Sequence, residues 1–192
     1  ILLSACNQNN ERVRISFNEN WNFKKGDWLA GTYVVNTEIW RLLDLPHDWA
    51  IEGPFDSIHN TRTGGLPISG TAWYRKIFIA PKAWKGKIVT IEFDGVMNNA
   101  EVFINGEKVA SRPYGYIGFE ADLTSNLKIG DENVIEVKVA PEENSSRWYT
   151  GAGIYRNTWL EIKNPIHISR WGTFIKTPKV EAGFAEVEIE TS

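Results

Sequence analysis

Residues 146–156, with the sequence SRWYTGAGIYR, gather side chains that can bind a polar ring compound. A Trp can stack on the apolar face of a pyranose while neighbouring hydroxyl and guanidinium groups bond to the ring's hydroxyl groups. The candidate ligand contacts are Ser146, Arg147 and Trp148. Trp148 and Tyr149 are both suited to stacking, and the sequence leaves the choice between them open. In residues 151–156 the two glycines permit a tight backbone, so we expect a structural role there.

Carboxylates are the other side chains with catalytic potential, because acid–base catalysis often uses a pair of them. Asp48, Glu52 and Asp56 cluster in a loop-like stretch, where such side chains are usually solvated or cap backbone NH groups. Carboxylates within strand-like runs alternate with apolar residues, so we expect a solvated face that carries Glu92, Glu101, Glu136 and Glu161. One Cys and three scattered His give no metal-ligand spacing. We therefore predict no catalytic residue, no metal site and no cofactor in this chain.

The charge and composition exclude several classes of protein. The 192 residues have a formal net charge of -3, whereas a nucleic-acid-binding chain usually shows a basic stripe. No run of about 18 consecutive apolar residues is present, so the sequence predicts no membrane-spanning helix. Nine Trp residues suit either a β-rich core or a surface that stacks on sugar rings.

The first residues resemble a bacterial lipoprotein processing signal. Residues 3–6 are an aliphatic residue, two small residues and Cys6, which in such signals is cleaved free and lipidated. The polar run 7–10 would then be a solvated tether. The alternative is an ordinary free Cys near a frayed terminus. We exclude residues 1–11 from the fold, and we expect a periplasmic or surface lipoprotein of the cell envelope that meets the membrane only through this anchor.

Short strand-like runs separated by Gly, Pro and Asn dominate the rest of the chain. The expected strands are residues 73–79, 87–93, 101–104, 107–110, 133–139 and 158–162. Asn105 and Gly106 stand between two of these runs, and this pair is a strong hairpin signal because both central positions of a type I′ turn need positive φ. No helix-period pattern of ten or more residues interrupts the runs. The sequence therefore predicts an all-β sandwich or barrel.

Two further features concern domain organisation. Residues 45–71 are rich in Pro and Gly, and we interpret them as an ordered surface loop with apolar anchors at Trp49, Ile51, Phe55 and Leu66. A boundary is expected at Asn164-Pro165, so residues 12–164 would form the first domain. Residues 166–171 and 185–190 again alternate and are expected to be strands. Because two strands rarely stand alone, we interpret residues 165–192 as the incomplete start of a second β-domain.

Three blocks in the middle of the chain carry a family resemblance: FDGVMNNAEVFINGEKV, GYIGFEADLTSNLKIGDENVIEVKV and SRWYTGAGIYRNTWLEI. With LPHDWAIEGPF and GTAWYRKIF upstream, they resemble the N-terminal sugar-binding domain of glycoside hydrolase family 2, closest to its β-galactosidases from Bacteroidota. The resemblance spans roughly residues 12–163. It implies a jelly-roll β-sandwich, followed by an immunoglobulin-like domain and a (β/α)8 barrel. In that family the barrel supplies both catalytic carboxylates, so this chain by itself is expected to be inactive.

The resemblance also implies which residues contact the substrate. In the family, loops of this domain close one side of the pocket that holds the non-reducing sugar. Asn60, or Thr61 if the alignment gap is placed differently, matches an Asn that contacts sugar hydroxyls, and Arg62 lies in the same stretch. Arg147 stands where some galactosidases carry an Asp, so a carboxylate contact is not carried over. An Arg can instead donate several hydrogen bonds.

The resemblance leads to one main hypothesis and several alternatives. The main hypothesis is a non-catalytic N-terminal domain of an exo-acting β-galactosidase, with β-galactoside-type carbohydrate and the downstream domains as partners. The alternatives are a stand-alone carbohydrate-binding lipoprotein module, the same domain in a β-glucuronidase or β-mannosidase, and an interdomain spacer.

Overall fold

The structure is a computed structural model that describes residues 12–32, 40–142 and 146–192 of the chain. The predicted lipidation site at Cys6 and its tether lie outside these residues. The helices within them are 3-10 turns: η2 (Ala50–Glu52), η3 (Thr61–Thr63), η4 (Lys82–Trp84) and η5 (Thr124–Asn126). None of these described helices has the length and apolar character needed to cross a bilayer.

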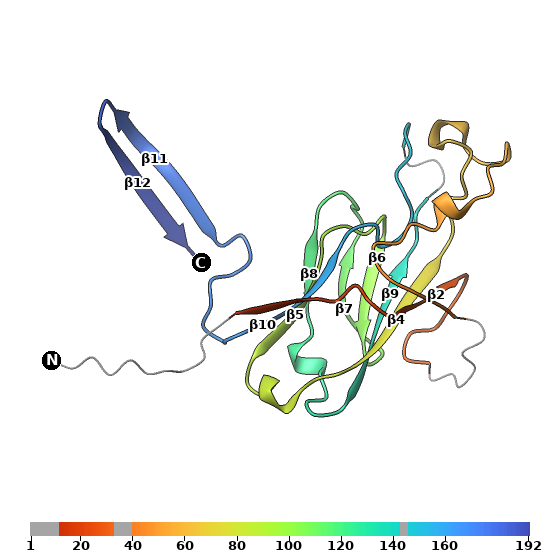
Figure 1. Cartoon of the computed structure of the whole chain (residues 1–192), viewed down its shortest axis with the longest axis horizontal. Coiled ribbons are helices and arrows are strands. Elements are labelled where there is room, and N and C mark those ends of the chain that lie inside the picture. The colour runs from red at the N-terminus through yellow and green to blue at the C-terminus, as the bar shows by residue number, and fades with distance from the viewer. Residues whose placement is uncertain (1–11, 33–39, 143–145) are drawn as a thin grey trace.

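Two antiparallel sheets pack against each other and form a β-sandwich (Figure 1). One sheet has the strand order β1 (Val13–Ser16), β10 (Thr158–Lys163), β5 (Ile88–Phe93) and β8 (Phe119–Asp122). The other sheet has the order β3 (Arg41–Leu43), β2 (Trp21–Lys25), β4 (Ala72–Ile79), β9 (Glu132–Val139), β6 (Ala100–Ile104) and β7 (Glu107–Arg112). The prediction of an all-β jelly-roll sandwich is confirmed.

The core between the sheets is built from side chains that alternate along the strands. In β5 the alternate residues Val89, Ile91 and Phe93 are all buried. Trp21 of β2 is also fully buried, and its indole Nε1 donates a hydrogen bond of 2.7 Å to the carbonyl of Phe17. Because this polar atom is satisfied, the ring contributes its whole apolar area to the core.

The Asn-Gly turn forms as predicted between β6 and β7. Asn105 and Gly106 have φ values of 52° and 89°. The side chain of Asn105 also bonds beyond its own hairpin: its Oδ1 accepts from the backbone NH of Val134 at 3.0 Å, and its Nδ2 donates to Asn133 Oδ1 at 2.9 Å. The residue therefore joins the turn to the neighbouring strand β9 as well as shaping the turn.

The prediction of a strand at residues 166–171 is wrong. This segment is an irregular link in which Arg170 forms an ion pair with Glu92 of β5, and Trp171 has a φ of 55°. Beyond it, β11 (Thr173–Glu181) and β12 (Phe184–Thr191) pair with each other, and β12 covers the predicted strand 185–190. Figure 1 shows this hairpin standing away from the sandwich.

The expectation that strand carboxylates face solvent is wrong for three of the four. Glu92, Glu136 and Glu161 are 7%, 1% and 4% exposed. Loop residues cover Glu136, whose carboxylate accepts hydrogen bonds from Trp28 Nε1 at 2.9 Å and from the backbone NH of Gly31 at 2.7 Å. An alternating pattern assigns a side chain to the outer face of a sheet, but it does not show whether a loop covers that face.

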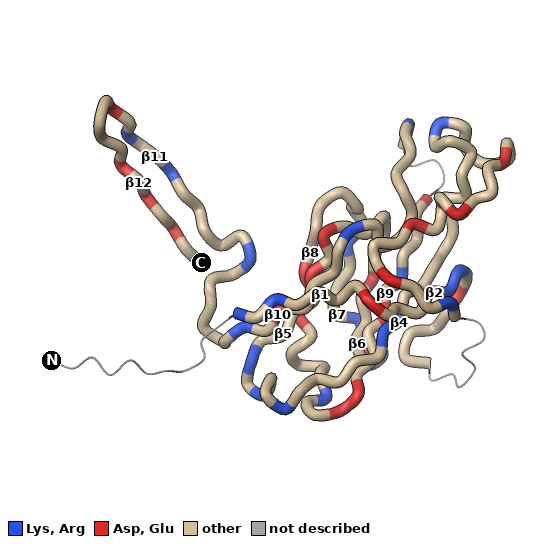
Figure 2. The backbone as a smooth tube through the Cα atoms, viewed as in Figure 1, with Lys and Arg blue, Asp and Glu red and all other residues tan. Residues whose placement is uncertain are grey.

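The outer face of the four-stranded sheet carries a network of ion pairs. Arg12 contacts Glu161 at 2.5 Å, Arg14 contacts Glu92 at 3.1 Å, and Arg170 also pairs with Glu92. Figure 2 shows basic and acidic residues side by side on this part of the chain. Because buried charges are tolerated when they are paired, the network explains how these carboxylates can lie beneath other side chains.

We expect Asn105→Ala to lower the free energy of unfolding by about 2–4 kcal/mol, because Ala disfavours positive φ and cannot make the side-chain bonds to β9. Urea unfolding followed by circular dichroism would measure the change. The matched control is Glu107→Ala on exposed β7, expected to stay within about 0.5 kcal/mol of the wild type. Equal stabilities of Asn105→Ala and the wild type would show that this asparagine does not specify the turn.

Candidate functional site

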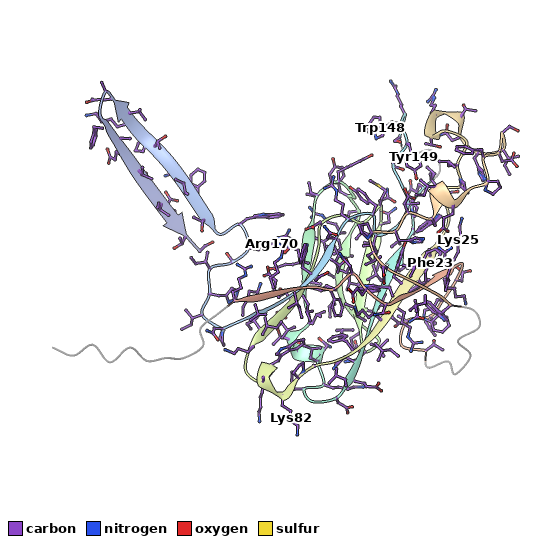
Figure 3. All side chains as sticks on the ribbon, in the orientation of Figure 1. Phe23, Lys25, Lys82, Trp148, Tyr149 and Arg170 are labelled. Carbon is purple, nitrogen blue, oxygen red and sulfur yellow. The ribbon has the colours of Figure 1, made fainter. Side chains whose placement is uncertain are left out.

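The candidate ligand contacts lie in two segments at one end of the sandwich. One is the long loop between β3 and β4, and the other is the segment 146–150 that follows β9. Figure 1 shows both extending beyond the same end of the sheets, and Figure 3 labels Trp148 and Tyr149 beside that loop. The site is therefore carried by loops on a rigid sandwich, which is a common place for binding residues.

The long loop is ordered by internal hydrogen bonds and by apolar side chains buried in the core. Trp49 and Leu66 are buried, as expected, whereas the predicted anchors Ile51 and Phe55 are 66% and 77% exposed. The backbone NH of Asp56 donates to the carbonyl of Gly65 at 2.9 Å and closes the loop on itself. This closure holds the loop tip without a buried apolar side chain there, so the assignment of Ile51 and Phe55 as anchors was wrong.

The two predicted contacts in this loop lie on the turn η3. Asn60 is its N-cap residue, and its Oδ1 accepts the backbone NH of Arg62 at 3.0 Å. The Asn60 carbonyl also accepts the hydroxyl of Thr63 at 2.8 Å. The Arg62 side chain is exposed. Capping fixes the position of Asn60 on the loop, while the exposed guanidinium of Arg62 can reach a molecule that approaches from outside.

One carboxylate fastens the long loop to the segment after β9. Asp48 Oδ1 accepts the backbone NH groups of Ala50 at 3.0 Å and of Ala152 at 2.9 Å. Its Oδ2 accepts the hydroxyl of Tyr149. Two backbone bonds run parallel to this contact: Trp49 NH to the Ala152 carbonyl at 3.0 Å and His47 NH to the Ile154 carbonyl at 2.8 Å. The predicted capping role of the loop carboxylates holds for Asp48, which in addition joins two segments far apart in the sequence.

A second set of contacts lies beneath this junction. His47 Nδ1 lies 2.7 Å from the hydroxyl of buried Tyr74. Burial lowers the pKa of His47, although the neighbouring Glu52 opposes the shift, and the ring is therefore neutral at pH 7. Burial likewise raises the pKa of Tyr74, which stays protonated. These groups provide fixed hydrogen bonds without adding a charge under the loop.

Gly153 shows why this segment needs glycine. Its φ is 128°, and a Cβ atom there would lie 2.3 Å from the Tyr74 hydroxyl and 2.6 Å from the His47 carbonyl. Its backbone NH and carbonyl both pair with Met97 at 2.9 Å. The expected structural role of residues 151–156 is supported by this packing and by fully buried Ile154. Within the described residues, Arg156 makes no ion pair and reaches two carbonyls at 3.4 and 3.5 Å.

The environments of Trp148 and Tyr149 differ. Burial and the Asp48 carboxylate raise the pKa of Tyr149 well above its usual value, so the phenol remains a donor to Asp48. Trp148 is 59% exposed, and its Nε1 donates a 2.7 Å hydrogen bond to the Tyr116 hydroxyl. Tyr149 thus makes a structural contact with Asp48. The ring of Trp148 is held by the hydrogen bond at its Nε1 edge, and its face is exposed. Of the two, Trp148 is the better stacking candidate.

The remaining two candidates flank this Trp. Ser146 is half-buried, and its hydroxyl donates to the carbonyl of Trp148. Arg147 is exposed and pairs with no acidic group among the described residues. Ser146 therefore shapes the local turn, and Arg147 offers free guanidinium donors at the surface.

Several residues that lie beside Trp148 were not predicted from the sequence as site residues. The segment Pro113–Tyr116 lies against it and contributes Tyr114 and Tyr116. Asn98, which follows β5, lines the same hollow. A signal was present in the run PYGY, because Pro and Gly favour a turn and aromatic side chains are common in the lining of small-molecule sites. The described part of the chain contains no cluster of three or more potential metal ligands.

We expect Asp48→Ala to lower the free energy of unfolding by about 2–3 kcal/mol, because it leaves the Ala152 NH and the Tyr149 hydroxyl without their acceptor. Asp48→Asn should bring the raised Tyr149 pKa down, since removing the negative charge makes loss of the phenol proton easier. Urea unfolding and NMR titration of labelled tyrosine would measure the two effects. Asp56→Ala, which removes only an exposed turn contact, is the control. An unchanged Tyr149 pKa in Asp48→Asn would contradict the assigned contact.

Comparison with known proteins gives the same family from sequence and from structure. The chain is 48% identical over 197 residues to the β-galactosidase BoGH2A of Bacteroides ovatus, covering 99% of this chain and 23% of that protein. It is 40% identical over 183 residues to a putative β-glucuronidase of Formosa agariphila, covering 94% of this chain and 18% of that protein. The chain thus spans less than a quarter of the length of these relatives.

A solved structure of a glycosyl hydrolase family 2 member from Bacteroides cellulosilyticus superimposes with a TM-score of 0.81 at 41% identity, covering 93% of this chain and 24% of that one. A β-glucuronidase of the same family superimposes with a TM-score of 0.83 at 33% identity, covering 96% of this chain and 22% of that one. The model of the family "Glycosyl hydrolases family 2, sugar binding domain" matches residues 58–165, more than half of the chain. With the β-sandwich and its paired loops, these matches show that the chain belongs to glycosyl hydrolase family 2 and contains that family's sugar-binding domain.

Proposed function

We propose that this chain is the non-catalytic N-terminal part of an exo-acting β-galactosidase and lines one side of its sugar pocket. The contacts would come from Asn60, Arg62, Ser146, Arg147 and Trp148. The observation that carries the proposal is the junction at Asp48, which holds the two predicted contact segments together at one end of the sandwich. The 48% identity to a β-galactosidase over nearly the whole chain supports the reaction class.

The buried carboxylates of this chain are poor candidates for hydrolysis. A retaining glycosidase needs two carboxyl groups about 5–5.5 Å apart, one of them able to donate a proton. Glu92 and Glu161 both contact Arg14, at 3.1 and 3.5 Å. Burial alone would raise the pKa of Glu161, but its pairing with Arg12 and Lys163 outweighs burial, and the pKa is lowered. Glu161, whose lowered pKa favours the ionised form, is unsuited to act as the acid. The resemblance to family 2 implies that the catalytic pair lies in a downstream (β/α)8 barrel.

The domain limits and the location are part of the proposal. The sandwich would be residues 12–164, and residues 165–192 would start an immunoglobulin-like domain. The mutual pairing of β11 and β12, apart from both sheets of the sandwich, supports this division. The lipobox-like run ending at Cys6 supports a lipid-anchored protein of the cell envelope, with residues 1–11 as signal remnant and tether.

A β-glucuronidase is the second candidate for the whole enzyme. The 40% identity to a putative β-glucuronidase and the superposition on a β-glucuronidase structure favour it. Recognition of a uronic acid requires a donor set for its carboxylate, and in the proposed arrangement much of that set belongs to the barrel. Parallel assays with a chromogenic β-galactoside and a chromogenic β-glucuronide would separate the two candidates.

The proposal is tested on a polypeptide that contains this chain together with the coding sequence that follows it. We expect Trp148→Ala and Arg147→Ala each to lower kcat/KM for a nitrophenyl β-galactoside by roughly tenfold or more, because the sugar loses positioning contacts. Trp171→Ala, which truncates an exposed Trp on the link after β10, is the matched control and should leave kcat and KM unchanged. Unchanged kinetics in both site variants would leave only a spacer role for the domain.

A further inference from the structure

Three side chains from different elements meet at the ring of His47, which stands near the start of the long loop. Arg41 comes from β3, Glu52 from η2 and Tyr74 from β4, and together with His47 they form the His47 cluster. The side chain of His47 is only 10% exposed. We propose that the His47 cluster is a pH-dependent attachment of the long loop: protonation of His47 breaks its contact with Arg41 and loosens the loop from the segment after β9.

The contacts of the neutral ring fix the position of its proton. Nε2 of His47 lies 2.9 Å from Nη2 of Arg41. A guanidinium group has only donors, so Nε2 accepts this hydrogen bond and the proton of the neutral ring is on Nδ1. Nδ1 then donates to the Tyr74 hydroxyl at 2.7 Å. The same Arg41 nitrogen donates to Glu52 Oε1 at 2.7 Å, so it bridges the ring and the carboxylate.

A second proton on His47 would occupy the position at which Nε2 accepts from Arg41. The contact would then join two donors and two positive charges. Glu52, whose Oε1 lies 3.2 Å from Nε2, is the group left to pair with the cation. Its side chain is 42% exposed, and Lys25 of β2 also interacts with it, so the pair that His47 gains is weakened by solvent and shared. Protonation therefore displaces either Arg41 or the ring.

The surroundings of the ring place this change in mildly acidic solution. Burial lowers the pKa of His47 from its usual value of 6.5; Glu52 and Asp48 oppose the shift, and Arg41 adds to it. From β2 the ring meets Phe23, an uncharged ring, at a centroid distance of 4.6 Å. The unfolded chain therefore binds the proton more readily than the folded chain. The stability that neutral His47 contributes is complete above pH 6.5 and is lost as the pH falls through the lowered pKa.

The backbone of His47 connects the ring to the attachment of the loop. Its NH donates to the Ile154 carbonyl at 2.8 Å, and the NH of Trp49 donates to the Ala152 carbonyl at 3.0 Å. The His47 carbonyl lies so close to Gly153 that a Cβ atom there would be 2.6 Å away. Such close packing leaves little room for the ring to move while the backbone stays in place. Displacement of the ring therefore weakens the two backbone bonds to the segment after β9.

The effect of this loosening on catalysis rests on the proposed function, whereas the attachment itself can be measured without a sugar. The test is hydrogen–deuterium exchange read by mass spectrometry, on the polypeptide that contains this chain and the coding sequence that follows it. Protection of the His47 and Trp49 amides, corrected for the intrinsic exchange rate, should fall at least about fivefold between about pH 7.5 and about pH 5, the scale of losing one hydrogen bond. The amides of β4 and β9 should stay protected in the same sample. Unchanged protection of His47 and Trp49 over this range would overturn the proposal.

A neutral replacement of the ring tests whether His47 is the group that titrates. His47→Gln keeps an amide that can accept from Arg41 but cannot become a cation, so protection of the loop should not change with pH. His167→Gln, which replaces an exposed histidine on the link after β10, is the matched control and should lose protection in acid as the wild type does. If a folded His47→Gln variant loses protection like the wild type, another group titrates and the proposal is wrong.

Arg41→Met answers the same question if His47→Gln fails to fold. It removes both the donor to Nε2 and the positive charge that opposes protonation, so the loss of protection in acid should be smaller than in the wild type. An undiminished loss in Arg41→Met would contradict the proposal. These exchange measurements are independent of the proposed wall function, because that function is measured by kcat/KM.

Discussion

The carboxylate of Asp48 is the contact on which the arrangement of the binding end depends. It reaches Tyr149, 101 residues away in the sequence, and Ala152, 104 residues away. A loop is conformationally flexible by itself. An acceptor shared by two loop segments therefore reduces the number of backbone conformations open to each of them. Because the acceptor is charged, each of its bonds is stronger than a bond between neutral groups. The long loop and the segment after β9 therefore behave as one unit, and the face that carries Trp148 is fixed by a residue that does not touch it.

Buried carboxylates also hold segments in place on the four-stranded sheet. Glu92 and Glu161 lie under Arg12, Arg14 and Arg170 on the outer face of the four-stranded sheet. Removing one partner from such a network leaves a buried charge, which costs more than the pair itself contributes. The link after β10 is fastened to this network by Arg170, so ionic contacts limit how the segment that follows can move against the sandwich.

The binding end combines hydroxyl and amide groups and the exposed guanidinium groups of Arg62 and Arg147 with exposed aromatic rings. This composition suits carbohydrate, whose hydroxyl groups need donors and acceptors and whose C–H face needs an aromatic surface. The relatives include both β-galactosidases and β-glucuronidases. In the proposed arrangement one type of sandwich can serve both kinds of enzyme, because the choice at C5 of the sugar is assigned mainly to residues of the barrel.

The sequence by itself determined the features that depend on short-range geometry. Alternation along residues 87–93 and 133–139 predicted two inner strands, β5 and β9, one in each sheet. The φ requirement of Asn105-Gly106 predicted the β6–β7 hairpin, which forms one edge of the six-stranded sheet. The resemblance of ordered blocks gave the family. The edge strands β1, β3 and β8, the strand β2 and the hairpin strand β11 were not identified, and residues 166–171 were misassigned, because short or exposed runs carry little periodic signal. Only the tertiary structure decided that Trp148 is open while Tyr149 is bound to Asp48, and that Glu92, Glu136 and Glu161 are covered. Those outcomes depend on contacts between residues far apart in the chain. A local sequence pattern contains no information about which distant side chain contacts a given residue.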